Sequence, residues 1–201
     1  MANPLLDFER LLYVRRKGLS VPQNWQGNSS IRKGARTPAN ALMVLTLTNG
    51  ATETVYQPVE PEYVGQFDLE YDAGKVLFSG IDRGGWCVKE IEIDPATGAM
   101  KAGSLRQVSP DMGRDIDNYD AGYLPDGRII FNSSSAYAGV PCVGGKDYVA
   151  NLHIMNADGT GVRRLCFEQD NDWNPVVMGN GRVMFLRWEY TDSAHYFSRV
   201  L

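Results

Sequence analysis

Hydrophobic and polar residues along this chain recur in a four-residue pattern of one basic residue, two aliphatic residues and one aromatic residue. The pattern occurs at Arg10-Leu11-Leu12-Tyr13, Lys75-Val76-Leu77-Phe78, Arg128-Ile129-Ile130-Phe131 and Arg182-Val183-Met184-Phe185. Its aromatic residues are 65, 53 and 54 positions apart, and all four are predicted to be equivalent and buried. A glycine turn precedes each of the last three occurrences, so each unit is predicted to start as strand, tight turn, strand.

The strands predicted around this pattern are short and evenly spaced. The second unit predicts strands at 65–71, 75–79, 88–93 and 105–108, and the third at 119–124, 128–133, 151–155 and 162–165. The first unit predicts strands at 11–14, 41–47 and 54–56, with a candidate opening strand at 3–9 and a long polar loop at 15–38. The fourth unit predicts 173–178, 182–187 and 197–201. No segment has a helical period of apolar residues.

Antiparallel four-stranded units of about 50 residues in series are typical of a β-propeller, in which each unit is one blade. We therefore expect an all-β chain, residues 1–201 forming one partial propeller of about 3.5 blades, with blade segments at 1–60, 61–108, 109–166 and 167–201. A β-sandwich also suits short strands with frequent turns, but the regular recurrence favours the propeller. A closed ring of six or seven blades needs more than about 300 residues at this spacing, so we expect a fragment of a ring.

Charge and composition narrow the classes of partner. The net charge is −4 with a pI near 5.2, and the basic residues are scattered apart from 15–17, so nucleic-acid binding is not expected. No stretch approaches the roughly 20 apolar residues of a membrane span, and no signal peptide is visible. The three cysteines form neither a CxxC nor a CxxCH haem motif, and two histidines are too few for a His-rich metal site.

One group of residues with side-chain oxygens suggests a metal site. Asp170, Asp172 and Asn174 have the spacing that opens a calcium-binding loop. Pro175 and Gly181 stand where that loop needs a turn glycine and a bidentate glutamate. Asp and Asn also stabilise turns, so turn formation is the favoured interpretation and calcium is the alternative.

The sequence offers little for nucleophilic catalysis. It contains no G-x-S-x-G motif, and His195 has no Ser or Cys motif that suggests a partner, so it is interpreted as a structural or rim residue. Three tryptophans, Trp86, Trp173 and Trp188, suit either stacking on a sugar or peptide or, more commonly in propellers, inter-blade core. Cys87 and Cys166 are predicted to be small buried hydrophobes.

Several motifs are similar to a known repeat. The run 152–165, LHIMNADGTGVRRL, followed by the segments 172–175 and 180–182, resembles the TolB-type (WD40-like) propeller repeat, whose P-D-G-R turn recurs at 125–128. The resemblance covers residues 64–201. More narrowly, the segments 117–120, 139–142 and 187–192 resemble the propeller region of large exported bacterial proteins related to the hydrazine synthase alpha subunit.

This resemblance implies a role and a location. In that group the propeller is one module of a longer chain, and the chemistry of the synthase resides on c-type haems in other domains. A chain without a haem motif is thereby implied to be a non-catalytic scaffold or binding module, with no cofactor of its own, that meets a protein partner or a neighbouring domain of a periplasmic or extracellular parent. The alternative is the propeller domain of an enzyme, a haem oxidoreductase or a hydrolase or lyase, whose catalytic domain lies elsewhere.

The loops predict which face binds. Loops alternate between the two ends of an antiparallel blade, so one face receives the tight glycine turns and the other receives the longer loops, including Arg83, Trp86, Asp192 and the insertion 137–146. We predict a ligand or partner site on this second face, near the channel, at Asp115, Asp117, Asp120, Asp170, Asp172, Trp173, Arg187, Glu189 and His195. The alternative is that the acids only cap turns. Open blade faces also predict self-association.

Overall fold

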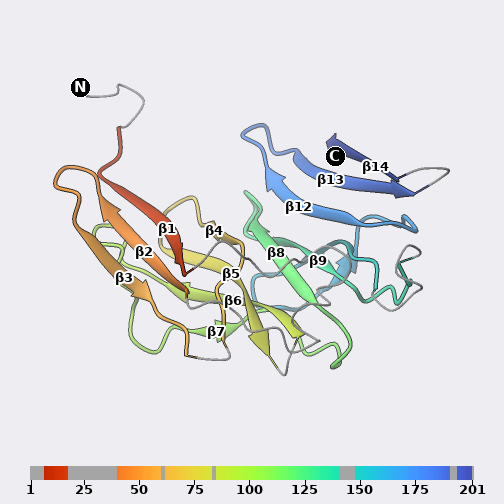
Figure 1. Ribbon diagram of the computed structural model, residues 1–201, viewed down its shortest axis with the longest axis horizontal. Coiled ribbons are helices and arrows are strands. Elements are labelled where there is room, and N and C mark those ends of the chain that lie inside the picture. Colours follow the sequence, from red (N-terminus) through yellow and green to blue (C-terminus); the bar gives the residue numbers. More distant parts are fainter. Residues whose placement is uncertain are drawn as a thin grey trace.

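A computed structural model describes residues 7–17, 40–59, 62–82, 85–140, 148–190 and 194–200. These residues form four antiparallel sheets that follow one another in chain order, with fourteen strands and no helix among the described residues (Figure 1). The predicted all-β architecture of blades in series is confirmed. We number the sheets as blades 1 to 4.

Each strand pairs with the next strand in sequence, so each blade is a simple meander. Blade 1 contains β1 (Arg10–Arg16), β2 (Asn40–Thr46) and β3 (Thr52–Tyr56). Blade 2 contains β4 (Phe67–Leu69), β5 (Lys75–Asp82), β6 (Gly85–Glu92) and β7 (Arg106–Gln107). Blade 3 contains β8 (Asn118–Tyr123), β9 (Ile129–Ser133), β10 (Asn151–Met155) and β11 (Arg163–Arg164). Blade 4 contains β12 (Asp172–Val177), β13 (Val183–Tyr190) and β14 (Ala194–Val200).

The recurring four-residue pattern packs each blade against both of its neighbours. In β9, Ile129 and Phe131 join the hydrophobic cluster shared with blade 2, whereas Ile130 joins the cluster shared with blade 4. In β5, Phe78 likewise faces blade 1 and Leu77 faces blade 3. Because side chains alternate along a strand, the first aliphatic and the aromatic face the preceding blade and the second aliphatic faces the next one.

Tyr13 departs from the prediction that all four aromatic residues are buried. Phe78, Phe131 and Phe185 are at most 3% exposed, but Tyr13 is only half-buried. The position is equivalent, since Tyr13 pairs with Met43 as Phe78 pairs with Lys89. Its side chain faces the side of blade 1 beyond which no other blade lies among the described residues, so its burial is incomplete.

The glycine turns between third and fourth strands lock neighbouring blades together. A Cβ on Gly98 of blade 2 would meet the Val44 side chain of blade 1, and a Cβ on Gly159 of blade 3 would meet the Val108 carbonyl at the end of blade 2. Beside the second contact, Arg106 Nη2 donates to Ala157 O over 3.1 Å. Each such turn therefore rests on the blade before it.

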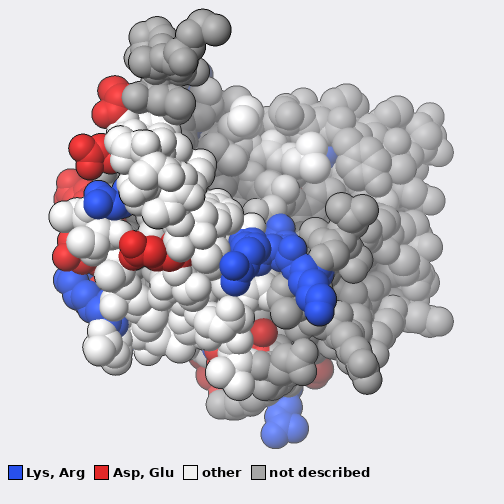
Figure 2. Space-filling view, turned by 60° about the vertical axis from the view of Figure 1, so that its left-hand side comes forward, with Lys and Arg blue, Asp and Glu red and all other residues white. Residues whose placement is uncertain are grey.

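Acidic and basic side chains both occur on the described part of one face of the molecule (Figure 2). The acidic side chains lie mainly toward the left of this view with basic ones among them, and further basic side chains form a short band near the middle. Among the described residues no helix is long and apolar enough to cross a membrane.

Candidate ligand-binding site

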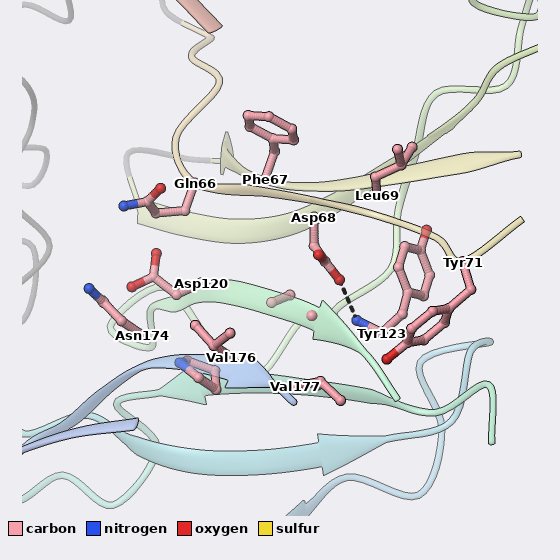
Figure 3. Close-up of a pocket in the computed structure, with 13 residues that line it drawn as sticks. Gln66, Phe67, Asp68, Leu69, Tyr71, Asp120, Tyr123, Asn174, Val176 and Val177 are labelled. Atoms are coloured by element: carbon pink, nitrogen blue, oxygen red, sulfur yellow. Dashed lines mark hydrogen bonds between the residues drawn. The ribbon is translucent and has the colours of Figure 1, made fainter. Parts of the chain in front are cut away.

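A pocket of about 360 Å³ lies between the first strands of three blades, β4, β8 and β12 (Figure 3). Its lining residues come from these strands and their flanks: Gln66, Phe67, Asp68, Leu69, Tyr71, Asp120, Ala121, Gly122, Tyr123, Asn174, Pro175, Val176 and Val177. First strands are the innermost strands of a propeller, so the pocket lies in the axial channel. We call it the axial pocket.

Two β-bulges shape one end of the axial pocket. The register of β8 on β9 shifts between Tyr119 and Gly122, and the register of β12 on β13 shifts between Trp173 and Val176. Asp120 and Asn174 occupy these bulges with φ of 48° and 50°. Asp and Asn tolerate this left-handed region better than other residues with a side chain. The bulges thereby turn a carboxylate and an amide toward the channel.

Gln66 completes this end of the axial pocket from blade 2. It directly precedes β4, and its carbonyl accepts a 2.8 Å hydrogen bond from Ser79 N in β5. In Figure 3 the side chains of Gln66, Asp120 and Asn174 lie together at one end, each from a different blade. Asp120 N also donates to Ser79 Oγ over 2.9 Å, which fixes blade 3 against blade 2. Three polar side chains therefore meet around the channel.

The other end of the axial pocket combines a carboxylate with tyrosine rings. Asp68 Oδ2 accepts a 2.8 Å hydrogen bond from Tyr123 N. Burial raises the pKa of Asp68 above its ordinary value, although this bond opposes the rise. The Tyr123 hydroxyl donates to Glu90 Oε1 over 2.9 Å, and burial together with nearby carboxylates raises the pKa of Tyr123. Tyr71 is exposed at this end.

Asp117 and Asp170 lie in the scaffold around the pocket rather than in its lining. Asp117 is 1% exposed, and its Oδ1 accepts a 2.9 Å hydrogen bond from Trp86 N. Its backbone N donates to Ser134 Oγ over 2.8 Å. The Asp170 carbonyl accepts a 3.0 Å bond from Asn151 Nδ2. These contacts connect blade 3 to blade 2 and to the start of blade 4.

Asp172 and Arg187 form a buried ion pair. The Asp172 side chain is fully buried, and its Oδ1 accepts a 2.8 Å hydrogen bond from Arg187 Nε. Burial raises the pKa of Asp172, although the hydrogen bond and charge of Arg187 oppose the rise. Arg187 Nη1 also lies 3.1 Å from Glu168 Oε1. Of the calcium candidates, Asp172 is thus directed at Arg187, whereas Asn174 lines the axial pocket.

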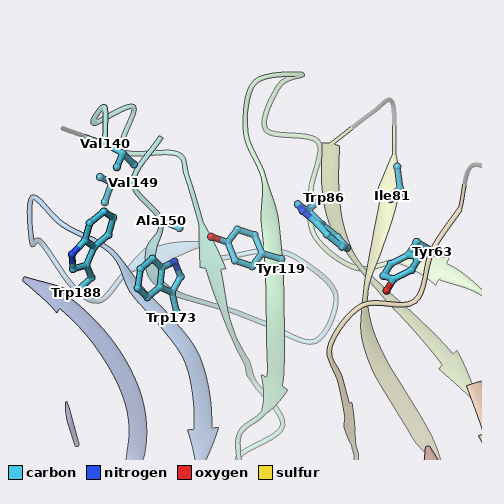
Figure 4. Close-up of a cluster of buried hydrophobic side chains, with 9 residues drawn as sticks. All are labelled: Tyr63, Ile81, Trp86, Tyr119, Val140, Val149, Ala150, Trp173 and Trp188. Atoms are coloured by element: carbon cyan, nitrogen blue, oxygen red, sulfur yellow. The ribbon is translucent and has the colours of Figure 1, made fainter. Parts of the chain in front are cut away.

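The tryptophans form a buried aromatic belt, shown in Figure 4. Trp173 stacks on Trp188 with ring centroids 5.8 Å apart and an interplanar angle of 16°. Trp86 meets Tyr63 edge-on at 6.2 Å. All four side chains are at most 4% exposed, so the core interpretation of these tryptophans is confirmed.

The remaining predicted site residues lie outside the pocket lining or outside the described structure. Asp115 is exposed in the loop before β8. The backbones of Glu189 and His195 pair across β13 and β14, but their side chains lie outside the described part of the chain. Arg83, Asp192 and residues 141–146 of the insertion are also outside it.

One serine and one histidine stand in a nucleophile–base geometry that the sequence did not suggest. Ser135 Oγ lies 3.1 Å from His153 Nε2, and His153 Nδ1 lies 3.0 Å from Asn151 O. His153 is 3% exposed, and burial lowers its pKa. Both ring nitrogens thus have partners inside the blade, away from the axial pocket. Among the described residues there is also no group of three His, Cys, Asp or Glu that could hold a metal ion.

The chain resembles known proteins in its structure. No family model matches it, and neither does any curated protein. Among solved structures it is similar to a putative TolB from Agrobacterium tumefaciens, with 19% identity and a TM-score of 0.58 over 81% of this chain and 53% of that chain. It is similar to Kuenenia stuttgartiensis hydrazine synthase, with 12% identity and a TM-score of 0.67 over 96% of this chain and 30% of that chain.

A puromycin hydrolase is also similar, with 14% identity and a TM-score of 0.56 over 81% of this chain and 25% of that chain. The chain thus spans about half or less of the length of each of these three proteins. At such identities the similarity concerns the fold. The chain therefore has the TolB-like β-propeller fold, built from antiparallel blades in series.

Proposed function

We propose that this chain is a non-catalytic propeller module that binds a ligand or partner at the axial pocket. One observation carries the proposal: Gln66, Asp120 and Asn174, from three successive blades, all turn toward the same channel. Polar side chains that converge in a concave site are the usual mark of a binding site. Other predicted acids have structural contacts instead: Asp117 joins blade 3 to blade 2, and Asp172 pairs with Arg187 within blade 4.

The described nucleophiles support a role without catalysis. Burial and the neighbouring Asp172 raise the pKa of the Cys166 thiol to about 12, so the thiol stays protonated and is a poor nucleophile. Ser135 contacts His153 within a blade, where His153 has only 3% of its surface open to solvent. Neither residue lines the axial pocket.

The partner we propose is a neighbouring domain of a longer, exported parent related to the hydrazine synthase alpha subunit, located in the periplasm or outside the cell. Support comes from the fold shared with hydrazine synthase along 96% of this chain, which is only 30% of that protein. Blade 4 also offers an apolar side to a neighbour, since Val176 is 51% exposed and Met184 is 38% exposed.

A second candidate is the propeller domain of an enzyme. The puromycin hydrolase and the hydrazine synthase among the similar structures favour it, because both names describe enzymes. The reading frame beyond Leu201 discriminates between the candidates. A CxxCH there would favour the haem protein, a G-x-S-x-G the hydrolase, and neither motif the binding module.

A ligand screen tests the binding proposal. Thermal unfolding of the 201-residue chain should be measured with panels of amines, carboxylates, sugars, dipeptides and calcium chloride. A ligand at a hundred times its Kd stabilises the folded state by about 2.7 kcal/mol, so at least one panel should raise the Tm. The rise should vanish in a Gln66→Ala, Asn174→Gly double variant and persist in Asn180→Gly, a control on a glycine turn. If no panel raises the Tm, or if the double variant still responds, the axial pocket is not the binding site.

A further inference from the structure

We propose that the axial pocket takes a small organic cation, a protonated amine on a short apolar or aromatic stem. This inference rests on the proposed function, because it names the ligand class of the same pocket. It is carried by the charge of the lining, by the hydrogen-bond acceptors at one end and by the surfaces between the ends.

The lining is acidic and contains no residue of opposite charge. Asp68 comes from blade 2 and Asp120 from blade 3, while none of the thirteen lining residues is Lys, Arg or His. Carboxylates in the lining of a pocket make its electrostatic potential negative, which favours a bound cation. Asp120 is only 5% exposed and lines the axial pocket.

The acceptors at one end match the donors of a primary ammonium group. The side chains of Gln66, Asp120 and Asn174 lie together at this end of the axial pocket, each from a different blade, and each carries an oxygen that can accept a hydrogen bond. An ammonium group has three N–H donors and no acceptor, so it can bond to all three oxygens at once. The hydrogen bond to the carboxylate is charge-assisted and is the strongest of the three.

The rest of the axial pocket suits an apolar stem. Val176 and Val177 lie between its two ends, and the rings of Tyr71 and Tyr123 lie at the end away from Gln66 (Figure 3). Aromatic faces attract cations and pack on apolar groups. A volume of about 360 Å³ is at the small end of ligand pockets, which suits one ring or a short chain.

Calorimetry with three isosteric probes tests the charge requirement. Benzylamine, benzyl alcohol and benzoate should be titrated into the 201-residue chain at pH 7. We expect benzylamine to bind at least about tenfold more tightly than benzyl alcohol, and benzoate not to bind. Asp120→Asn should weaken benzylamine binding by about tenfold or more, because it removes the charge and keeps the shape. Asn also tolerates the left-handed backbone at this position.

The matched control is Asp126→Asn, which makes the same charge change in an exposed turn outside the axial pocket and should leave the affinity within about twofold. Circular dichroism establishes that each variant is folded, and Gln66→Ala provides a second pocket variant if Asp120→Asn unfolds. Equal binding of benzyl alcohol, or benzylamine binding unchanged in the folded pocket variants, overturns the amine assignment. The amine assignment is also overturned if benzylamine does not bind while calcium chloride does, and if the Asp120→Asn variant loses that calcium binding. If neutral compounds bind in the pocket and amines do not, this inference fails while the proposed function stands; if nothing binds, both fail.

Discussion

The turn at Gly159 gives a sharp test of how neighbouring blades are held together. Gly159 has φ of +84°, and a Cβ there would lie closer than 3.0 Å to the Val108 carbonyl oxygen, a separation that real Cβ atoms essentially never show. Gly127 occupies a similar turn of the same blade with φ of +83°, and a Cβ there would meet nothing within 4 Å. Replacing either glycine by alanine therefore causes the same backbone strain, but only Gly159→Ala adds a clash between blades.

The expected magnitudes follow from these two geometries. A left-handed backbone costs an alanine about 1 to 2 kcal/mol, which is the whole effect expected for Gly127→Ala. Overpacking against a neighbouring group costs about a further 1 to 3 kcal/mol, so Gly159→Ala should lose about 2 to 5 kcal/mol of unfolding free energy. Because the obstacle is a backbone carbonyl, no rotamer change can relieve it.

Urea unfolding followed by circular dichroism measures both variants. The midpoint of Gly159→Ala should fall well below that of Gly127→Ala, while the slope of free energy on urea stays the same. Equal losses in the two variants would refute the claim that this turn rests on the Val108 carbonyl. A Gly159→Ala variant as stable as the wild type would refute the backbone argument as well.

Three further outcomes are expected. Arg187→Met should cost about 3 kcal/mol in urea unfolding, because it leaves the buried Asp172 carboxylate without its cation; a loss below about 1 kcal/mol would contradict this role. Burial pushes the pKa of Glu62 up, but hydrogen bonds from neighbouring side chains outweigh it and lower the net pKa below 4.5. The Glu62 carboxylate therefore stabilises the fold above that pH, and this stabilisation is lost as the pH falls through the folded-state pKa. The unfolding free energy of the Glu62→Gln variant should thus decrease less than that of the wild type between neutral and acid pH. Self-association in light scattering should decrease when Met184→Lys places a charge on the apolar side of blade 4, and an unchanged mass would argue that another surface is responsible.

The blade architecture could be predicted because it repeats. Alternation of side chains, glycine turns and the basic-aliphatic-aliphatic-aromatic pattern all act within one unit, so each copy strengthens the same interpretation. The predicted strand 151–155 coincides with β10. Tyr13 was mispredicted because burial depends on what lies beyond the blade, which a pattern inside the blade does not contain.

The candidate site was predicted less completely. Asp120 and Asn174 were singled out from their residue types, but the bulges that turn them toward the channel break the two-residue alternation and were not predicted. Gln66 and Asp68 were missed because alternation along the predicted strand 65–71 does not show which side chains face the channel, and the structure keeps only Phe67–Leu69 of it as β4. Arg187 was predicted as a site residue, but the strand register that places it opposite Asp172 was not predicted. Sequence separation alone does not give that register.

The two-sided packing of the four-residue pattern gives the array of blades a direction, because the two faces of each blade differ. The side of a blade that carries the aromatic residue differs from the side that carries the second aliphatic, so the outer surfaces of blades 1 and 4 are not copies of one another. A contact that joins the Leu11 side of one molecule to the Met184 side of another is heterologous, because each partner contributes a different surface. Such contacts repeat from molecule to molecule in one direction. They produce closed rings or growing filaments rather than a two-fold dimer, and in an open filament every added copy leaves the same pair of unlike surfaces at the two ends.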